Sequence, residues 1–146
     1  MNKGQEFLYN ALTADENGLE WLEYVSRTDL INIPDDKKYC ALIVEQPFDF
    51  SQVVPNRPAT KLIEDFNISV LIPAKNTNDL SEENFKDIRG ELYDKSAQVV
   101  AVIANAVRTA NGISNVVFGR GNADFITVSS RPYDLMIIPV KITLIN

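Results

Sequence analysis

Residues 81–111 carry the strongest structural signal in the sequence, an amphipathic helix of about 30 residues. Ser81 is a natural N-cap, and Leu80 and Phe85 stand at the two positions of a hydrophobic staple. Apolar residues then recur at three- and four-residue steps until Asn111-Gly112 supplies a left-handed stop. A helix of this length needs a sheet or other helices to cover its apolar face.

Strands are predicted on both sides of this helix. Residues 64–73 alternate apolar and polar side chains, which predicts a half-buried strand, and residues 39–44 form a continuous apolar run typical of a strand covered on both faces. After the helix, 113–118 and 125–128 are strand candidates, and Gly119-Arg120-Gly121-Asn122 between them predicts a hairpin turn. The long helix is therefore expected to pack on a sheet.

The chain is predicted to end in a strand over residues 135–145, after a turn at residues 131–134. Four apolar side chains of this strand face one way: Ile138, Val140, Ile142 and Leu144. Pro139 has no N–H to donate to a sheet ladder. This strand is therefore expected at an edge of the sheet, or bulged near Pro139.

The N-terminal third shows helical spacing of apolar residues over 4–12 and again over 18–26, with a break at Asp15-Glu16-Asn17-Gly18. At 146 residues the chain has the size of one domain, here 1–146. The predicted fold class is α+β: a mixed, mainly antiparallel sheet of about four or five strands packed against the helix 81–111, with short N-terminal helices. Gly90 weakens that helix by about 1 kcal/mol relative to alanine and is typical of a kink or a close contact.

The net charge of −6 lies entirely in residues 1–50, which hold ten acidic and four basic side chains. An acidic chain lacks the clustered lysines and arginines that neutralise phosphates, so direct DNA binding is not expected. An acidic surface suits a channel that DNA passes as cargo. No secretory signal and no apolar run long enough to span a membrane is present, which predicts a soluble protein.

The sequence predicts no catalytic, cofactor-binding or metal site. It contains no histidine, which removes imidazole-based catalysis and metal ligation. Its single cysteine, Cys40, lies inside an apolar run, so a core role is favoured over a nucleophile, and a reducing compartment suits it. The acidic pairs Asp35-Asp36, Glu64-Asp65 and Glu82-Glu83 are explained by a turn, a strand and a helix start, and adjacent strand residues point to opposite faces.

Two further groups of side chains have simple structural interpretations. The aromatic residues Phe7, Tyr9, Trp21 and Tyr24 have helical spacing and are expected to pack against the sheet rather than stack on a ligand. The arginines Arg57, Arg108, Arg120 and Arg131 are spread over loops and element ends. Each either pairs with acidic groups of a neighbouring subunit or is solvated, and a solvated surface arginine is the simpler interpretation.

Residues 46–60 are predicted to form a loop, because Pro47, Pro55 and Pro58 exclude a regular helix or central strand. The loop is unusually apolar for a solvent-facing segment. Its apolar residues need a partner inside or outside the domain. The candidate subunit-interface residues are Phe48, Phe50, Val53, Val54 and Arg57.

In layout, the chain resembles the small tail terminator or tail-completion (neck) proteins of tailed bacteriophages. The resemblance is carried by Lys61–Pro73 leading to the Ser81–Gly112 helix, and by the closing strands Phe125–Val128 and Ile137–Leu144. It covers most of the chain and includes no diagnostic motif. The acidic stretch Asn17–Lys38 has no counterpart among the features of that family.

The resemblance implies a structural protein of the virion without enzymatic activity and without a cofactor. Such subunits form a ring, commonly a hexamer, that caps the tail tube and joins it to the head connector. The implied partners are further copies of the chain, the tail tube protein and the connector or neck proteins, with DNA only as cargo and no membrane. The implied location is the tail or neck of the virion, and the host cytoplasm during assembly.

Other functions remain open at this point. A tail tube or head–tail adaptor subunit fits the same layout, although tube subunits are expected to be richer in strand. From another class, a small ligand-binding or regulatory module would use Trp21 and the loop segment Phe48–Val54 as its pocket. An enzyme would have to rely on aspartate and glutamate alone, and no sequence feature separates such residues from surface ones.

Overall fold

The computed structural model describes residues 3–27, 33–46, 61–74 and 82–145, and their side chains except those of 61–62 and 82–88. A six-stranded sheet forms the centre of the molecule. Five strands follow the order β1-β2-β3-β6-β4, and β5 pairs with another part of β6, on the same side as β4. The strands are β1 (Tyr24–Ser26), β2 (Cys40–Glu45), β3 (Lys61–Pro73), β4 (Ile113–Phe118), β5 (Asn122–Val128) and β6 (Arg131–Ile145). The helices are α1 (Lys3–Thr13), α2 (Glu82–Ala106) and the short 3-10 turn η3 (Val107–Thr109).

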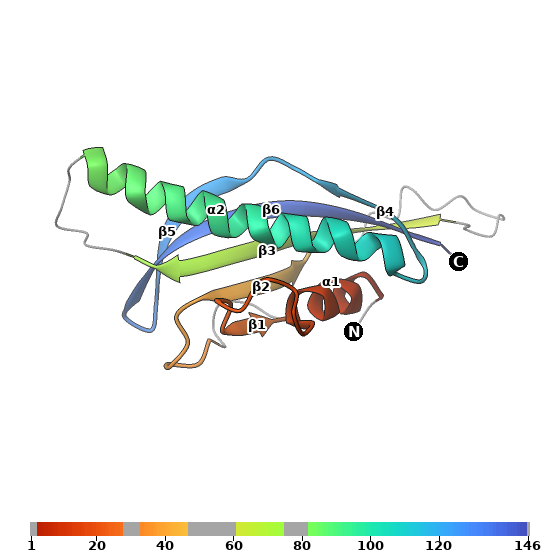
Figure 1. Cartoon of the computed structure of the whole chain (residues 1–146), viewed down its shortest axis with the longest axis horizontal. Helices are drawn as coiled ribbons and strands as arrows, with labels where there is room; N and C mark the ends of the chain where they lie inside the picture. Colours follow the sequence, from red (N-terminus) through yellow and green to blue (C-terminus); the bar gives the residue numbers. More distant parts are fainter. Residues whose placement is uncertain (1–2, 28–32, 47–60, 75–81, 146) are drawn as a thin grey trace.

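This architecture confirms the predicted α+β class with one long helix on a mixed sheet. The β1–β2 pair is parallel, and the other pairs are antiparallel. Figure 1 shows α2 running along β3 and β6, with α1 beside β1 and β2. Five of the six strands were predicted, and the short strand β1 was not.

The face of the sheet that carries α1 and α2 holds the main core. The predicted alternation of β3 is confirmed, because Phe66, Ile68, Val70 and Ile72 are all buried against the helices. The four even-numbered residues predicted for the last strand lie on the same face. The helices contribute Leu8, Ala11, Leu12, Leu92, Val99 and Ile103 to this core.

A second, smaller cluster lies on the opposite face, formed by Ile33, Cys40, Leu42, Leu71, Val128, Tyr133 and Leu135. In β2, Leu42 belongs to this cluster while Ala41 and Ile43 belong to the main core. The prediction of a β2 strand covered on both faces is therefore confirmed.

The last strand lies in the interior of the sheet and pairs with β3 without interruption through Pro139, so the predictions of an edge position and of a bulge in this strand were both wrong; the extra residue lies in the neighbouring outer chain. β6 pairs with β3 on one side and with β4 and β5 on the other. Phe118 pairs with Val140 and Asn122 with Ile137, so three residues of the outer chain oppose Ile138 and Pro139. Pro139 accepts a hydrogen bond from the Gly119 N–H at 2.8 Å, so its missing N–H faces this bulge.

The predicted hairpin at residues 119–122 is wrong, because β4 and β5 lie end to end along β6 and do not pair with each other. The hairpin turn lies instead at Ser129 and Ser130, which have φ of 50° and 66° between the paired Val128 and Arg131. The predicted turn at 131–134 is the start of β6. Serine is a weak signal for two left-handed residues, which explains the error.

The break predicted at residues 15–18 is confirmed, but the second helix predicted over 18–26 is not formed. Asn17 donates to the carbonyls of Ala11 and Leu12 at the end of α1 and accepts from the Leu19 N–H at 2.9 Å. Gly18 has a left-handed φ of 85°. These interactions turn the chain into the short strand β1.

The long helix ends close to the predicted stop, with α2 passing into η3 and Gly112 in a left-handed conformation (φ 80°). The predicted cap and staple, Leu80, Ser81 and Phe85, lie outside the described residues or side chains. At Gly90 a Cβ would meet no atom within 4 Å, so the close contact predicted as one explanation is absent among the described residues.

The substitution Gly90→Ala should therefore stabilise the protein by about 1 kcal/mol, because alanine is the better helix former and the space is open. Gly4→Ala is the matched control with the opposite sign. A Cβ at Gly4 would lie 2.9 Å from Phe66 Cε2 and 3.0 Å from Glu64 Oε1, both on buried side chains. Urea unfolding measures both; equal effects of the two substitutions would contradict this packing of α1.

Candidate contact surface

The outer edge of the sheet, here called the β4–β5 edge (Ile113–Val128), is the longest open edge that the structure describes. Along it β4 and β5 pair only with β6, and no further strand lies outside them in the described parts of the chain. Figure 1 shows that the junction of β4 and β5 forms the outermost point of this edge. An open edge of this length is a ready contact for another chain.

Two large apolar side chains on this edge are exposed, Val117 at 51% and Phe125 at 50%. Val117 pairs with Lys141 and Phe125 with Asp134, positions of opposite parity on β6, so the two side chains lie on opposite faces of the edge. A partner that covers the edge would remove both from water. Burial of such side chains contributes about 1.5–3 kcal/mol each when complete.

The predicted interface residues of the proline-containing loop, Phe48, Phe50, Val53, Val54 and Arg57, all lie outside the described residues. Their role as an interface stays a prediction. At the start of this loop, Gln46 donates its backbone N–H to the Asp65 carbonyl at 2.9 Å. A groove of about 570 Å³ begins there and crosses the sheet to Gly119, with Asn67, Pro139 and Lys141 in its wall.

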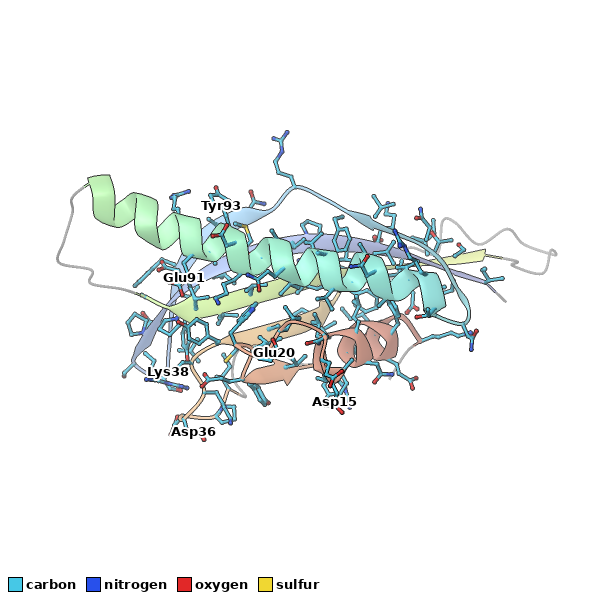
Figure 2. All side chains as sticks on the ribbon, viewed as in Figure 1. Asp15, Glu20, Asp36, Lys38, Glu91 and Tyr93 are labelled. Carbon is cyan, nitrogen blue, oxygen red and sulfur yellow. The ribbon has the colours of Figure 1, made fainter. Side chains whose placement is uncertain are left out.

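Four carboxylates, here called the acidic rim, surround a hollow of about 460 Å³ between the end of α1 and β1. They are Asp15, Glu16, Glu20 and Glu23. The hollow is also lined by Leu12, Leu19, Leu22 and Val25. Figure 2 places Asp15 and Glu20 on the side of the molecule that carries α1, away from the β4–β5 edge. The acidic rim and the β4–β5 edge therefore lie on opposite sides of the sheet order.

Glu23 also has an internal role that the sequence did not indicate. Its Oε2 accepts the backbone N–H groups of Lys38 and Tyr39 at 2.7 and 3.0 Å. The hydrogen bonds from Tyr39 and then Lys38 hold the pKa of Glu23 below its ordinary value. Glu23 thus ties the rim to the start of β2, and all four carboxylates of the rim are exposed.

Arg131 is bound within its own chain and is not a solvated surface arginine. Its Nη1 donates to the carbonyls of Pro34, Asp35 and Lys37 at 3.1–3.2 Å, and its Nη2 donates to that of Ile33. The predicted turn around Asp35 is confirmed, and Arg131 holds it against the second face of the sheet. Arg108 and Arg120 are exposed, and Arg57 lies outside the described residues.

The aromatic residues pack internally, as predicted. The Trp21 indole N–H donates to Gln98 Oε1 on α2 at 2.8 Å. The Trp21 and Tyr39 rings pack edge to face, with their centroids 6.2 Å apart. The Lys95 ammonium lies 4.7 Å from the Trp21 ring. Trp21 joins the segment before β1 to α2 and lines neither the acidic hollow nor the groove at Gln46.

The two buried groups that sequence reasoning considered for chemistry have structural roles. Burial raises the pKa of the Cys40 thiol to about 11, which keeps it protonated and unreactive at neutral pH. Glu64 is buried and accepts the Gly4 N–H at 3.1 Å, at the start of α1. Asp65 lines the groove on the other face, so the predicted separation of these two carboxylates is confirmed.

A carboxylate beneath α2 is a polar group that the sequence did not indicate. Burial raises the pKa of Asp134, Arg89 lowers it and Glu91 raises it. Its buried Oδ2 accepts no hydrogen bond from the described residues.

Within those residues, no group of three His, Cys, Asp or Glu side chains is placed to hold a metal ion. None of the helices is long and apolar enough to cross a membrane over the residues described.

Comparison with known proteins identifies no family. No protein-family model matches the sequence, and no curated protein matches it. Among solved structures, the chain is similar to one in the "Virion of native gene transfer agent (GTA) particle". That similarity has 15% sequence identity and a TM-score of 0.47, and covers 95% of this chain and 93% of the other. A likeness at this level establishes neither a family nor a function.

Replacing Glu64 with glutamine should flatten the pH dependence of stability above pH 4.5, the ordinary pKa of this carboxyl. Burial raises the folded-state pKa, so the folded protein binds this proton more tightly than the unfolded chain. The stabilisation from that proton is present below the unfolded pKa and is lost as pH rises through the folded pKa. Urea unfolding between pH 4 and 7 measures this, with exposed Asp94→Asn as control. An unchanged pH slope in Glu64→Gln would contradict the assignment.

Arg131→Lys should destabilise the protein by about 1–3 kcal/mol, because lysine cannot reproduce a fork of hydrogen bonds to several carbonyls. The exposed Arg108→Lys is the matched control and should change stability by less than about 0.5 kcal/mol. Thermal unfolding gives the stability, and amide exchange near Lys37 reports the turn itself. Equal stability of the two variants would show that Arg131 does not hold the turn.

Proposed function

We propose that this chain is a structural, non-enzymatic subunit of a phage-like virion, a tail terminator or neck protein that forms a ring. The ring would cap the tail tube and join it to the head connector. The chain would act in the virion, and in the host cytoplasm during assembly. Its partners would be further copies, the tail tube protein and the connector proteins, with DNA as cargo only.

The observation that carries this proposal is the open β4–β5 edge with its exposed Val117 and Phe125. A ring subunit needs surface of this kind on its flank, where a neighbouring chain covers it. The fold also supports the proposal. The segments that carry the resemblance to tail terminators, β3, α2, β5 and β6, form one continuous unit of helix on sheet.

Two alternatives from the sequence have less support. A tail tube subunit is expected to be dominated by strand, whereas here 50 described residues of strand are accompanied by 39 of helix. The predicted pocket of a ligand-binding module included Trp21. In the structure the Trp21 indole N–H donates a hydrogen bond to Gln98, and its ring packs against Tyr39. The other part of its pocket, Phe48–Val54, lies outside the described residues.

Deleting the gene from the genome that encodes the phage-like particle should give tails of uncontrolled length that are not joined to heads. A tube without its cap continues to add subunits and presents no surface to the connector. Electron microscopy of lysates measures tail length and the fraction of joined particles, with plasmid-borne wild type as the rescue control. Tails of normal length on complete particles would overturn the proposal.

Purified protein added to purified tail tubes gives a direct second measurement. The proposal expects it to co-sediment with the tubes and to appear as a ring at one end only. Binding along the whole tube would favour a tube subunit, and no binding would count against both structural roles.

A further inference from the structure

We propose that the β4–β5 edge of one copy docks against the acidic rim of a second copy, so that copies associate head to tail. This inference rests on the proposed function, because it names the surfaces through which the ring subunits would meet. The occupant of the open edge is therefore another copy of this chain.

The two surfaces lie on opposite flanks of the molecule. The acidic rim adjoins β1, the first strand in the sheet order, and the β4–β5 edge is the last. A head-to-tail contact requires two different surfaces facing away from each other on each copy. This arrangement leaves both available at once, so every copy can have two neighbours.

The charges of the two surfaces are complementary. No aspartate or glutamate occurs between Asp94 and Asp124, a stretch that includes Arg120 and all of β4. Lys141 pairs with Val117 and adds a further exposed positive charge beside the edge. Asp124 is the only carboxylate of residues 113–128; it accepts the Phe125 N–H at 2.8 Å and keeps its negative charge, so the positive charge of this edge is carried by Arg120 and the neighbouring Lys141.

The rim supplies the opposite charge over an apolar floor. Asp15, Glu16 and Glu20 are exposed, and Leu22 and Val25 line the hollow between them and β1. Arg27 is the cation closest in sequence to this hollow, and its guanidinium is stacked on the Tyr9 ring at 3.8 Å. The hollow thus offers carboxylates to Arg120 and apolar surface to the exposed side chains that flank it.

The position of Arg120 disfavours the other simple use of an open edge, antiparallel pairing of two identical edges about a two-fold axis. Residue 120 lies at the middle of the β4–β5 edge, in the bulge between Gly119 and Gly121. A two-fold axis through that point would bring the Arg120 side chains of both copies together. Like charges directly opposite each other destabilise a strand pair, so the edge favours a different, acidic surface.

A charge-exchange experiment tests the contact. Two full-length variants are made, Arg120→Glu and the double variant Asp15→Lys with Glu20→Lys, and sedimentation velocity measures self-association. Each variant alone opposes like charges at the contact and should associate at least tenfold more weakly than wild type. An equimolar mixture should recover association, because every edge then meets a rim of opposite charge. Association of wild type should weaken in about 1 M salt, where charges beyond about 3 Å are screened.

The control Arg108→Glu changes net charge by the same amount as Arg120→Glu, at an exposed residue of η3, and should associate like wild type. Circular dichroism and thermal unfolding confirm that the variants fold. Wild type that stays monomeric up to about 1 mM would overturn the contact. So would Arg120→Glu that associates like wild type, or a mixture that stays dissociated.

The outcome separates this inference from the proposed function. Tail defects on gene deletion together with monomeric protein would support the virion role and overturn the head-to-tail contact. Recovery of association in the mixture together with normal tails on deletion would support the contact and overturn the virion role. Recovery in the mixture would also argue against an acidic rim that faces a DNA channel, because such a surface would not need a basic partner.

Discussion

The pairing of β3 with β6 is the contact on which the rest of the molecule depends. It runs the full 13 residues of β3 and joins Lys61 to Ile145 across most of the chain. On one side of this pair β2 pairs with β3, and on the other side β4 and β5 pair with β6. Because β6 lies in the interior of the sheet, the main core and the outer edge both depend on β6 having joined β3.

Much of the fold was predictable because its strongest patterns are local. The alternation in β3 and the three- and four-residue steps of α2 each record burial against one face, so sequence identified both. The errors came where two structures share one pattern. Leu19, Leu22 and Val25 have helical spacing, but the hydrogen bonds of Asn17 turn this segment toward β1. The two strand candidates at 113–118 and 125–128, with Gly119–Asn122 between them, fit a hairpin and a bulged continuous edge equally well.

The candidate contact surface was less predictable than the fold, because exposure depends on strand order. In the sequence, Val117 and Phe125 are ordinary strand residues. In the structure they are exposed on β4 and β5, outside which the described part of the chain places no further strand. A signal was present in Pro139 together with Gly119 and Gly121. A proline within an interior strand needs an interrupted neighbour, and a Cβ at Gly119 would lie 3.0 Å from the Pro139 ring. Residues 46–60 were predicted as the interface because their composition alone is unusual.

Strand order also converts a charge asymmetry along the sequence into one across the molecule. The acidic segment precedes β1 on one flank, and the stretch without carboxylates ends at the opposite flank. Surfaces of opposite sign on opposite flanks satisfy each other only in a head-to-tail contact, which closes into a ring when its rotation divides a full turn. Neighbouring strands of a sheet rotate by roughly 20–25° relative to each other. The twist accumulated between β1 and β4 therefore fixes the angle between the two contact surfaces, and with it the number of copies that such a ring would hold.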